Sequence, residues 1–106
     1  MRILAVVDAK RAQSAPQIPT VAESALPGFV ASGWVAMFAA AATPPAVLDR
    51  WNAEVTAILD LAEVRAGFVR AGIEADPRTR QEAREFHLGE IRKWGDAIRS
   101  ANIKVE

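Results

Sequence analysis

The chain has 106 residues, which suffices for one domain with a modest core, and its 51% apolar and 25% charged residues match a folded globular protein rather than a disordered one. Its thirteen basic and thirteen acidic side chains cancel, so no net field favours binding to nucleic acid. The absence of cysteine excludes disulfides, thiolate nucleophiles and zinc–thiolate sites.

The first expected element is a strand at Ile3–Val7, a short continuous apolar run of the kind buried in a mainly parallel sheet. Asp8 interrupts this run before it reaches the length of a signal-peptide core, so we expect no export signal in the chain as given. A loop at 12–19 then leads to Thr20 and Glu23, whose spacing is that of a capping box and predicts a short helix.

A second strand is expected at Gly33–Phe38, after a helix stop at Leu26-Pro27-Gly28. The longest apolar stretch, Val35–Ala42, is shorter than the ~20 residues that span a bilayer. Thr43-Pro44-Pro45 predicts a helix start with Thr43 as the N-cap. The long helix that follows is amphipathic, with an apolar stripe formed by Leu48, Trp51, Val55, Ile58, Leu59 and Ala62.

Further helical segments are expected in the rest of the chain. Glu63–Ala71 forms either a second helix or a continuation of the preceding one, and it is ended by Gly72, at a position where a left-handed C-cap is usual. Ile73–Ala75 is short enough for an edge strand, and Thr79 with Glu82 repeats the capping-box spacing. The inner face of the final helix would be formed by Ala83, Phe86, Ile91, Trp94 and Ile98.

The predicted order is therefore β-α-β-α-α-(β)-α, which belongs to the α/β class. Two clear strands make too small a sheet for a typical α/β domain, whose sheets average about five or six strands. The sequence thus indicates part of a larger fold.

Residues that could carry chemistry do not form a catalytic set. His87 is the one histidine, and with Glu90 three residues later it would give two metal ligands on one helix, so a partly buried histidine or a solvated ion pair is the favoured interpretation. No serine lies in a Gly-x-Ser-x-Gly elbow, and no enzyme activity, metal or cofactor is expected. Trp51 and Trp94 lie in apolar stripes and predict core packing, whereas Trp34 would line a cleft or fill the core.

In chain order, a set of short segments resembles the C-terminal region of the TctC-like solute-binding proteins of tripartite tricarboxylate transporters, also called the Bordetella uptake gene family. The order and spacing of these segments across essentially the whole chain carry the resemblance. Ala39–Ala42 departs from it, because the family usually has Pro and Gly there. The matching segments are Arg2–Val6, Ala9–Arg11, Ile18–Glu23, Leu26–Phe29, Ser32–Trp34, Thr43-Pro44, Leu48–Val55, Glu63–Arg65, Glu90–Trp94 and Ala101–Lys104.

This resemblance implies the C-terminal segment of a two-lobed, type II-like periplasmic binding protein. Residues 1–33 would end one lobe and approach the hinge, and residues 34–106 would hold the hinge crossing and the terminal helices of the other lobe. The implied function is to bind a small carboxylated solute in the periplasm and deliver it to the transporter's membrane subunits. Thr20 and Trp34, which flank the crossing, are the expected ligand-binding residues, although helix capping is the stronger interpretation of Thr20.

A second hypothesis is a stand-alone interaction module without a transport role. Such a module would bury an exposed sheet edge by forming a homodimer.

Overall fold

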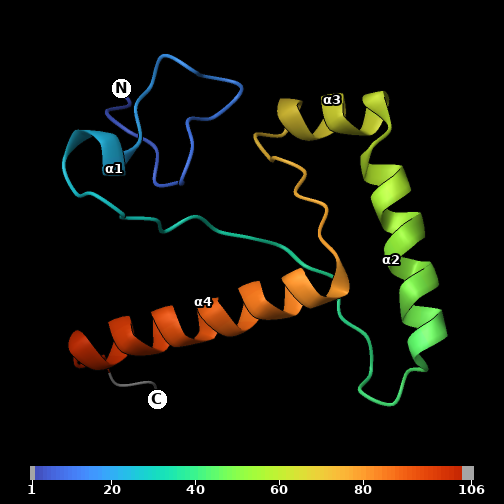
Figure 1. Ribbon diagram of the computed structural model, residues 1–106. Helices are drawn as coiled ribbons and strands as arrows, with labels where there is room; N and C mark the ends of the chain where they lie inside the picture. Colours follow the sequence, from blue (N-terminus) through green and yellow to red (C-terminus); the bar gives the residue numbers. More distant parts are fainter. Residues whose placement is uncertain (1, 104–106) are drawn as a thin grey trace.

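The computed structural model describes residues 2–103, and each helix in this part of the chain lies within a few residues of its predicted position. They are α1 (Val21–Ser24), α2 (Pro45–Leu59), α3 (Ala62–Arg70) and α4 (Arg80–Ser100) (Figure 1). Between α1 and α2 the chain runs extended past the first half of α4 (Figure 1). Of the helices in residues 2–103, none combines the length and the apolar composition that a bilayer crossing needs.

Both predicted capping boxes are confirmed. The hydroxyl of Thr20 accepts a hydrogen bond from the Glu23 N–H at 3.1 Å, and the Glu23 carboxylate accepts one from the Thr20 N–H at 2.9 Å. Thr79 and Glu82 form the same reciprocal pair at the start of α4. Each box satisfies donors that have no partner inside the first helical turn, which fixes where these two helices begin.

The start of α2 differs from the prediction. Pro44 rather than Thr43 occupies the N-cap, and no side chain caps the helix. The two prolines explain this, because a proline at the first helical position has no N–H to satisfy and its fixed φ already suits a helix. The end of α3 is as predicted: Gly72 follows it with φ of +72°, the left-handed conformation that glycine adopts without strain.

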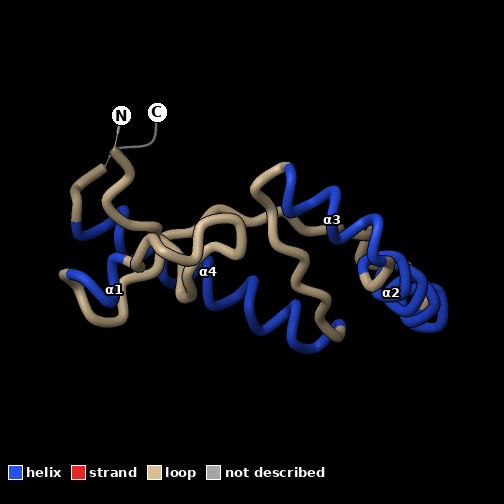
Figure 2. The backbone as a smooth tube through the Cα atoms, turned by 90° about the horizontal axis from the view of Figure 1, so that it is seen from above, coloured by secondary structure: helices blue, strands red, loops and turns tan. Residues whose placement is uncertain are grey.

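The three expected strands lie as extended or irregular segments without a ladder. In the described part of the chain, Figure 2 shows helices joined by loops and no strand, and β pairing there is limited to one isolated parallel bridge between Val6 and Thr20. A strand is stable only when neighbouring strands pair with it, and Ile3–Val7, Gly33–Phe38 and Ile73–Ala75 do not pair with one another. The pairing partners that the sequence pattern calls for are not among residues 2–103.

The described residues form no closed apolar core. Among the described residues none of the hydrophobic side chains is fully buried, and Trp51 and Trp94, expected in the core, remain 45% and 43% exposed. The radius of gyration is 16.8 Å, whereas a compact domain of this length has about 13 Å. The helices therefore form an open framework rather than a closed domain.

Candidate functional site

An aromatic cluster joins the extended segment after α1 to the middle of α4. The indole ring of Trp34 meets the rings of Phe86 and His87 edge to face, with centroids 5.5 and 5.7 Å apart. Phe38, four residues further along the extended segment, also contacts His87, at 5.2 Å. Such edge-to-face pairs are favourable beyond their buried area. The cluster thus fixes the extended segment against one face of α4.

Glu90 is the polar centre of this cluster. One of its carboxylate oxygens accepts hydrogen bonds from the indole N–H groups of Trp94, at 2.9 Å, and Trp34, at 3.3 Å. The other oxygen pairs with the ammonium group of Lys93. The Glu90 side chain is only 12% exposed. The spacing of Glu90 and Trp94 along a helix could have revealed their contact, but Trp34 lies 56 residues away in sequence.

The environment of Glu90 favours its charged form. The hydrogen bond from Lys93 is the largest influence and holds the pKa of Glu90 below its ordinary value. The indole N–H groups of Trp94 and Trp34 lower this pKa further, while partial burial opposes the shift. At neutral pH the cluster therefore contains a carboxylate whose partners are already in place.

In the described part of the chain, His87 lies among aromatic rings rather than among candidate metal ligands. Its ring lies against Trp34 and Phe38, and its buried Nδ1 atom has no hydrogen-bond partner among the described residues. Glu90 bonds to the tryptophans and the lysine instead of to His87. In residues 2–103 no three histidine or acidic side chains come close enough together to hold a metal ion.

Thr20, the other predicted ligand-binding residue, is the most buried residue of the described chain, at 2% exposure. Its hydroxyl caps α1, and its carbonyl accepts a hydrogen bond from the Ser24 hydroxyl at 2.9 Å. The backbone beside it is tied to the first segment, because the Val21 N–H donates to the Val6 carbonyl at 2.9 Å. No hydrogen bond or ring contact in the described part of the chain joins Thr20 to Trp34, so the two residues belong to separate local structures.

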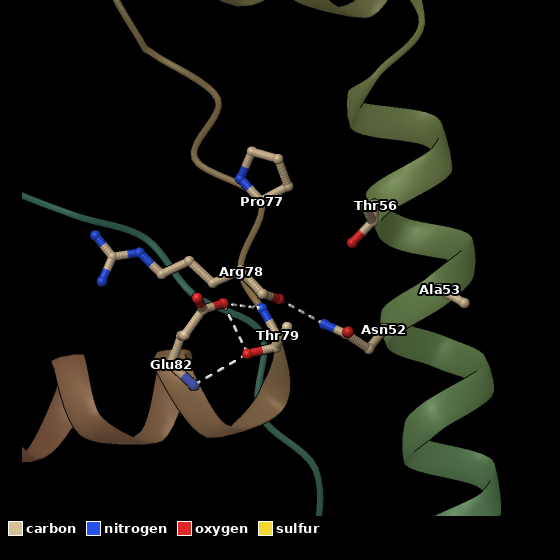
Figure 3. Close-up of a pocket in the computed structure, with 7 residues that line it drawn as sticks. All are labelled: Asn52, Ala53, Thr56, Pro77, Arg78, Thr79 and Glu82. Carbon is tan, nitrogen blue, oxygen red and sulfur yellow. Dashed lines mark hydrogen bonds between the residues drawn. The ribbon is translucent and has the colours of Figure 1, made fainter.

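An open groove of about 330 Å³ lies between α2 and the loop that precedes α4 (Figure 3). Asn52 and Thr56 project from α2 toward this loop, and the Asn52 amide donates to the Arg78 carbonyl at 2.9 Å. The remaining lining residues are Ala53, Pro77, Thr79 and Glu82.

Most of the polar groups of this groove are already used by the fold. The guanidinium of Arg78 pairs with Asp76 at 2.6 Å and lies 4.1 Å from the centre of the Phe86 ring. Thr79 donates from its hydroxyl and its N–H to the Glu82 carboxylate, and these bonds hold the pKa of Glu82 below its ordinary value. The groove therefore stabilises the start of α4 and offers few free groups to a ligand.

The chain matches a known protein family along nearly all of its length. The sequence model described as "Tripartite tricarboxylate transporter family receptor", TctC, matches residues 1–103. BugT of Bordetella pertussis is 30% identical over 106 residues, which cover all of this chain and 32% of BugT. A UPF0065 protein from the tcbD–tcbE intergenic region of Pseudomonas sp. strain P51 is 30% identical over 99 residues, which cover 92% of this chain and 30% of that protein.

A solved structure has the same fold. Rpa4515 of R. palustris, determined with adipate, superposes with a TM-score of 0.78 at 28% identity, over 95% of this chain and 34% of Rpa4515. This likeness confirms the predicted fold class, a part of an α/β binding-protein fold. The open framework of helices is thus the conformation that such a segment has inside a larger protein.

The chain spans about a third of the length of the relatives that it matches. The family match over residues 1–103, the relatives at 30% identity and the shared fold agree with one another. The chain therefore belongs to the TctC family of tripartite tricarboxylate transporter receptors.

Proposed function

We propose that the chain is the C-terminal portion of an extracytoplasmic solute-binding receptor, which binds a small carboxylate and delivers it to a tripartite tricarboxylate-type transporter in the membrane. The observation that carries this proposal is the family match over residues 1–103. The adipate in the structure of Rpa4515 supports a carboxylate as the class of solute. Receptors of this kind act in the periplasm, and we place the protein there.

We further propose that the chain contributes to two lobes and to the crossing between them, with the division near residues 33 and 34. Two observations support this division. The backbone of Val6, Val7, Val21 and Ala31 is joined by hydrogen bonds among these segments, which ties residues 6–31 together. Trp34 and Phe38, beyond this division, instead contact Phe86, His87 and Glu90 on α4. One hydrogen bond crosses the division, from the Gln13 N–H to the Glu74 carboxylate at 2.9 Å.

Thr20 and Trp34, on either side of this division, are our proposed cleft residues. Their present contacts constrain how they would act. The Thr20 hydroxyl already accepts the Glu23 N–H, and the indole N–H of Trp34 already donates to Glu90. Thr20 would therefore act by holding the backbone around α1 in position, and Trp34 would present the exposed part of its ring, which is 38% exposed as a residue.

The test uses a fusion in which residues 1–106 replace the matched third of BugT; we call it the BugT fusion. A panel of dicarboxylates and tricarboxylates, adipate included, is titrated while tryptophan fluorescence is followed. We expect a saturable change with at least one carboxylate and a weakened response in Trp34→Leu. A BugT fusion that unfolds cooperatively but responds to none of the panel would contradict carboxylate binding.

The stand-alone interaction module is the alternative. The unpaired extended segments favour it, because an exposed strand edge is a template for pairing with another chain. It predicts a stable dimer of the 106-residue chain without any other protein, which sedimentation equilibrium would detect.

A further inference from the structure

Glu90 is the acceptor on which two tryptophans from distant parts of the chain converge. Its Oε2 atom accepts the indole N–H of Trp94 at 2.9 Å and that of Trp34 at 3.3 Å. A carboxylate oxygen has two lone pairs, and these two bonds use both. Lys93 pairs with the Oε1 atom. Rotation of the Glu90 side chain would break all three interactions together, so they hold it in one orientation.

The burial of Glu90 sets it apart from the surface ion pairs. Its side chain is 12% exposed, whereas the carboxylates of the other ion pairs in the described chain are 48–75% exposed. A carboxylate withdrawn from water is costly unless its oxygens are bonded, and those of Glu90 are. Glu90 is therefore part of an ordered arrangement and not a loosely held surface charge.

The indole ring of Trp34 is held by three side chains of α4. The rings of Phe86 and His87 meet it at interplanar angles of 75° and 88°. These two contacts restrict the plane of the indole, and the hydrogen bond from its Nε1 atom to Glu90 fixes the rotation within that plane. Phe86 is itself held, because the guanidinium of Arg78 lies 4.1 Å from the centre of its ring. The orientation of Trp34 therefore depends on Glu90.

The exposed part of Trp34 can offer only carbon surface. The residue is 38% exposed, but an indole has a single hydrogen-bond donor, and Trp34 already donates it to Glu90. The ring therefore has no polar group left for the carboxylate group of a solute. It can contact the carbon chain of the solute instead.

The charge of Glu90 does not explain a role toward an anionic solute. A carboxylate alone would repel another carboxylate. The ammonium group of Lys93 pairs with Glu90 and also lies 5.2 Å from the centre of the Trp94 ring, so the cluster carries no net charge at this point. An influence of Glu90 on the solute must therefore act through the geometry of Trp34.

We propose that Glu90 is a positioning residue of the receptor, which through Trp34 sets an indole ring against the carbon chain of the bound carboxylate. The proposal rests on the proposed function and on the place of Trp34 at the cleft. It also assigns the solute a class, a carboxylate with an apolar chain rather than a hydroxylated tricarboxylate.

The first test concerns the arrangement itself and needs no solute. Tryptophan is labelled with 15N in the 106-residue chain and in the BugT fusion, and the indole N–H signals are followed by NMR from pH 7 to 3. The signals of Trp34 and Trp94 should shift together as Glu90 is protonated, whereas Trp51 on α2 should not follow them. A Trp34 signal that stays unchanged in both proteins would overturn the proposal.

The second test separates the position of the acceptor from its charge. In the BugT fusion, calorimetry measures the dissociation constant of adipate. Glu90→Asp keeps the charge but withdraws the oxygen by one methylene group, and should weaken binding about fivefold, the equivalent of one hydrogen bond. Glu90→Gln loses the charge but keeps an acceptor oxygen, and should retain most of the affinity. The reverse order would show that charge and not position matters.

A double-mutant cycle shows whether Glu90 acts through Trp34. In the Trp34→Leu fusion, Glu90→Asp should have no further effect on the dissociation constant of adipate, because the ring to be positioned is gone. Equal effects in the two backgrounds would contradict the proposal.

Two solutes test the contact with the carbon chain. Adipate carries its carboxylates on an unbranched hydrocarbon chain, whereas citrate is hydroxylated. The parent fusion should bind adipate more tightly than citrate, and Trp34→Leu should reduce this preference. A preference that Trp34→Leu leaves unchanged would contradict the chain contact.

Thr79→Ala is the control for a loss of stability. It removes the cap of the same helix at a residue outside the cluster, and should lower the free energy of unfolding without changing the dissociation constant of adipate. An equal loss of affinity would show that stability accounts for the effect. A parent fusion that unfolds cooperatively but binds no carboxylate contradicts the receptor function, whereas binding that is insensitive to Glu90→Asp contradicts only the positioning role.

Discussion

Two neighbouring regions of the chain, residues 6–31 and residues 32–39, are organised in opposite ways. In the first, backbone hydrogen bonds join Val6 to Pro19, Val21 to Val6 and Ala31 to Val7, and the capping box of Thr20 completes the structure. In the second, backbone pairing is absent among the described residues, and side-chain contacts with α4 alone hold the segment.

The difference shows which parts of a receptor fold can organise themselves. A loop and a short helix satisfy their own backbone groups, because the partners lie within about 25 residues in sequence. A central strand of a sheet cannot do so, because both of its partners are other strands. Residues 32–39 have no such backbone partners among the described residues, so side-chain contacts alone hold them.

The largest expected effect is in hydrogen exchange, which measures this difference directly. In the free chain, the amides of residues 34–38 should exchange about a hundredfold faster, after correction for sequence, than those of Val6, Val21 and Ala31, which donate to carbonyl groups. Mass spectrometry of short peptides or NMR would give the rates. Equal protection in both regions would contradict the comparison.

Removal of the Trp34 ring should give the next largest effect. Trp34→Ala deletes the contacts with Phe86 and His87 and the bond to Glu90, and should lower the free energy of unfolding of the BugT fusion by about 2 kcal/mol. We expect less than half of this loss for Trp34→Phe, which keeps an aromatic ring. Urea unfolding provides the measurement, and a loss no larger for Trp34→Ala than for Trp34→Phe would show that the ring contacts do not hold the segment.

Thr20 and Thr79 form equivalent capping boxes, so the loss of one can be compared with the loss of the other. Thr20→Ala should cost about 1 kcal/mol in urea unfolding of the BugT fusion, because it removes a cap that is also buried. Thr79→Ala removes the equivalent bond at an exposed position and should cost less. If Thr20 acts by positioning α1, Thr20→Ser should retain both stability and carboxylate response, whereas Thr20→Ala should reduce the response.

The smallest expected effect concerns Glu90 and pH. Because the pKa of Glu90 is lowered in the folded protein, its contribution to stability is present above about pH 4.3, the ordinary pKa of a glutamate, and is lost as the pH falls through the lower folded value. Glu90→Gln should therefore lower the free energy of unfolding at pH 7 by less than about 1 kcal/mol, and it should have no effect at a pH low enough to protonate Glu90 in the folded protein. A larger loss in acid than at pH 7 would contradict this sign.

A charge-matched control isolates the role of the cluster. Glu54 on α2 lies 4.0 Å from Arg50, and both side chains are mostly exposed. Glu54→Gln removes the same charge outside the cluster and should leave stability nearly unchanged at both pH values. Thermal unfolding from pH 3 to 7 would compare the two variants.

The helix boundaries could be predicted because their signals are local. Thr20 and Thr79 each have a glutamate three residues later, and Gly72 ends α3 with the backbone conformation expected of it. Thr43 misled the prediction, since the consecutive prolines moved the helix start by one residue. The segments that resemble the TctC family predicted the family, which the match over residues 1–103 confirms.

The sequence by itself therefore determined the helices, the α/β class, the need for more strands and the family. Only the tertiary structure decided that Glu90 joins Trp34 to Trp94, and that Thr20 and Trp34 belong to separate local structures. The physical reason is distance along the chain. Caps and stops act within a few residues, whereas contacts such as the one between Trp34 and Glu90, 56 residues apart, depend on how the whole chain is arranged.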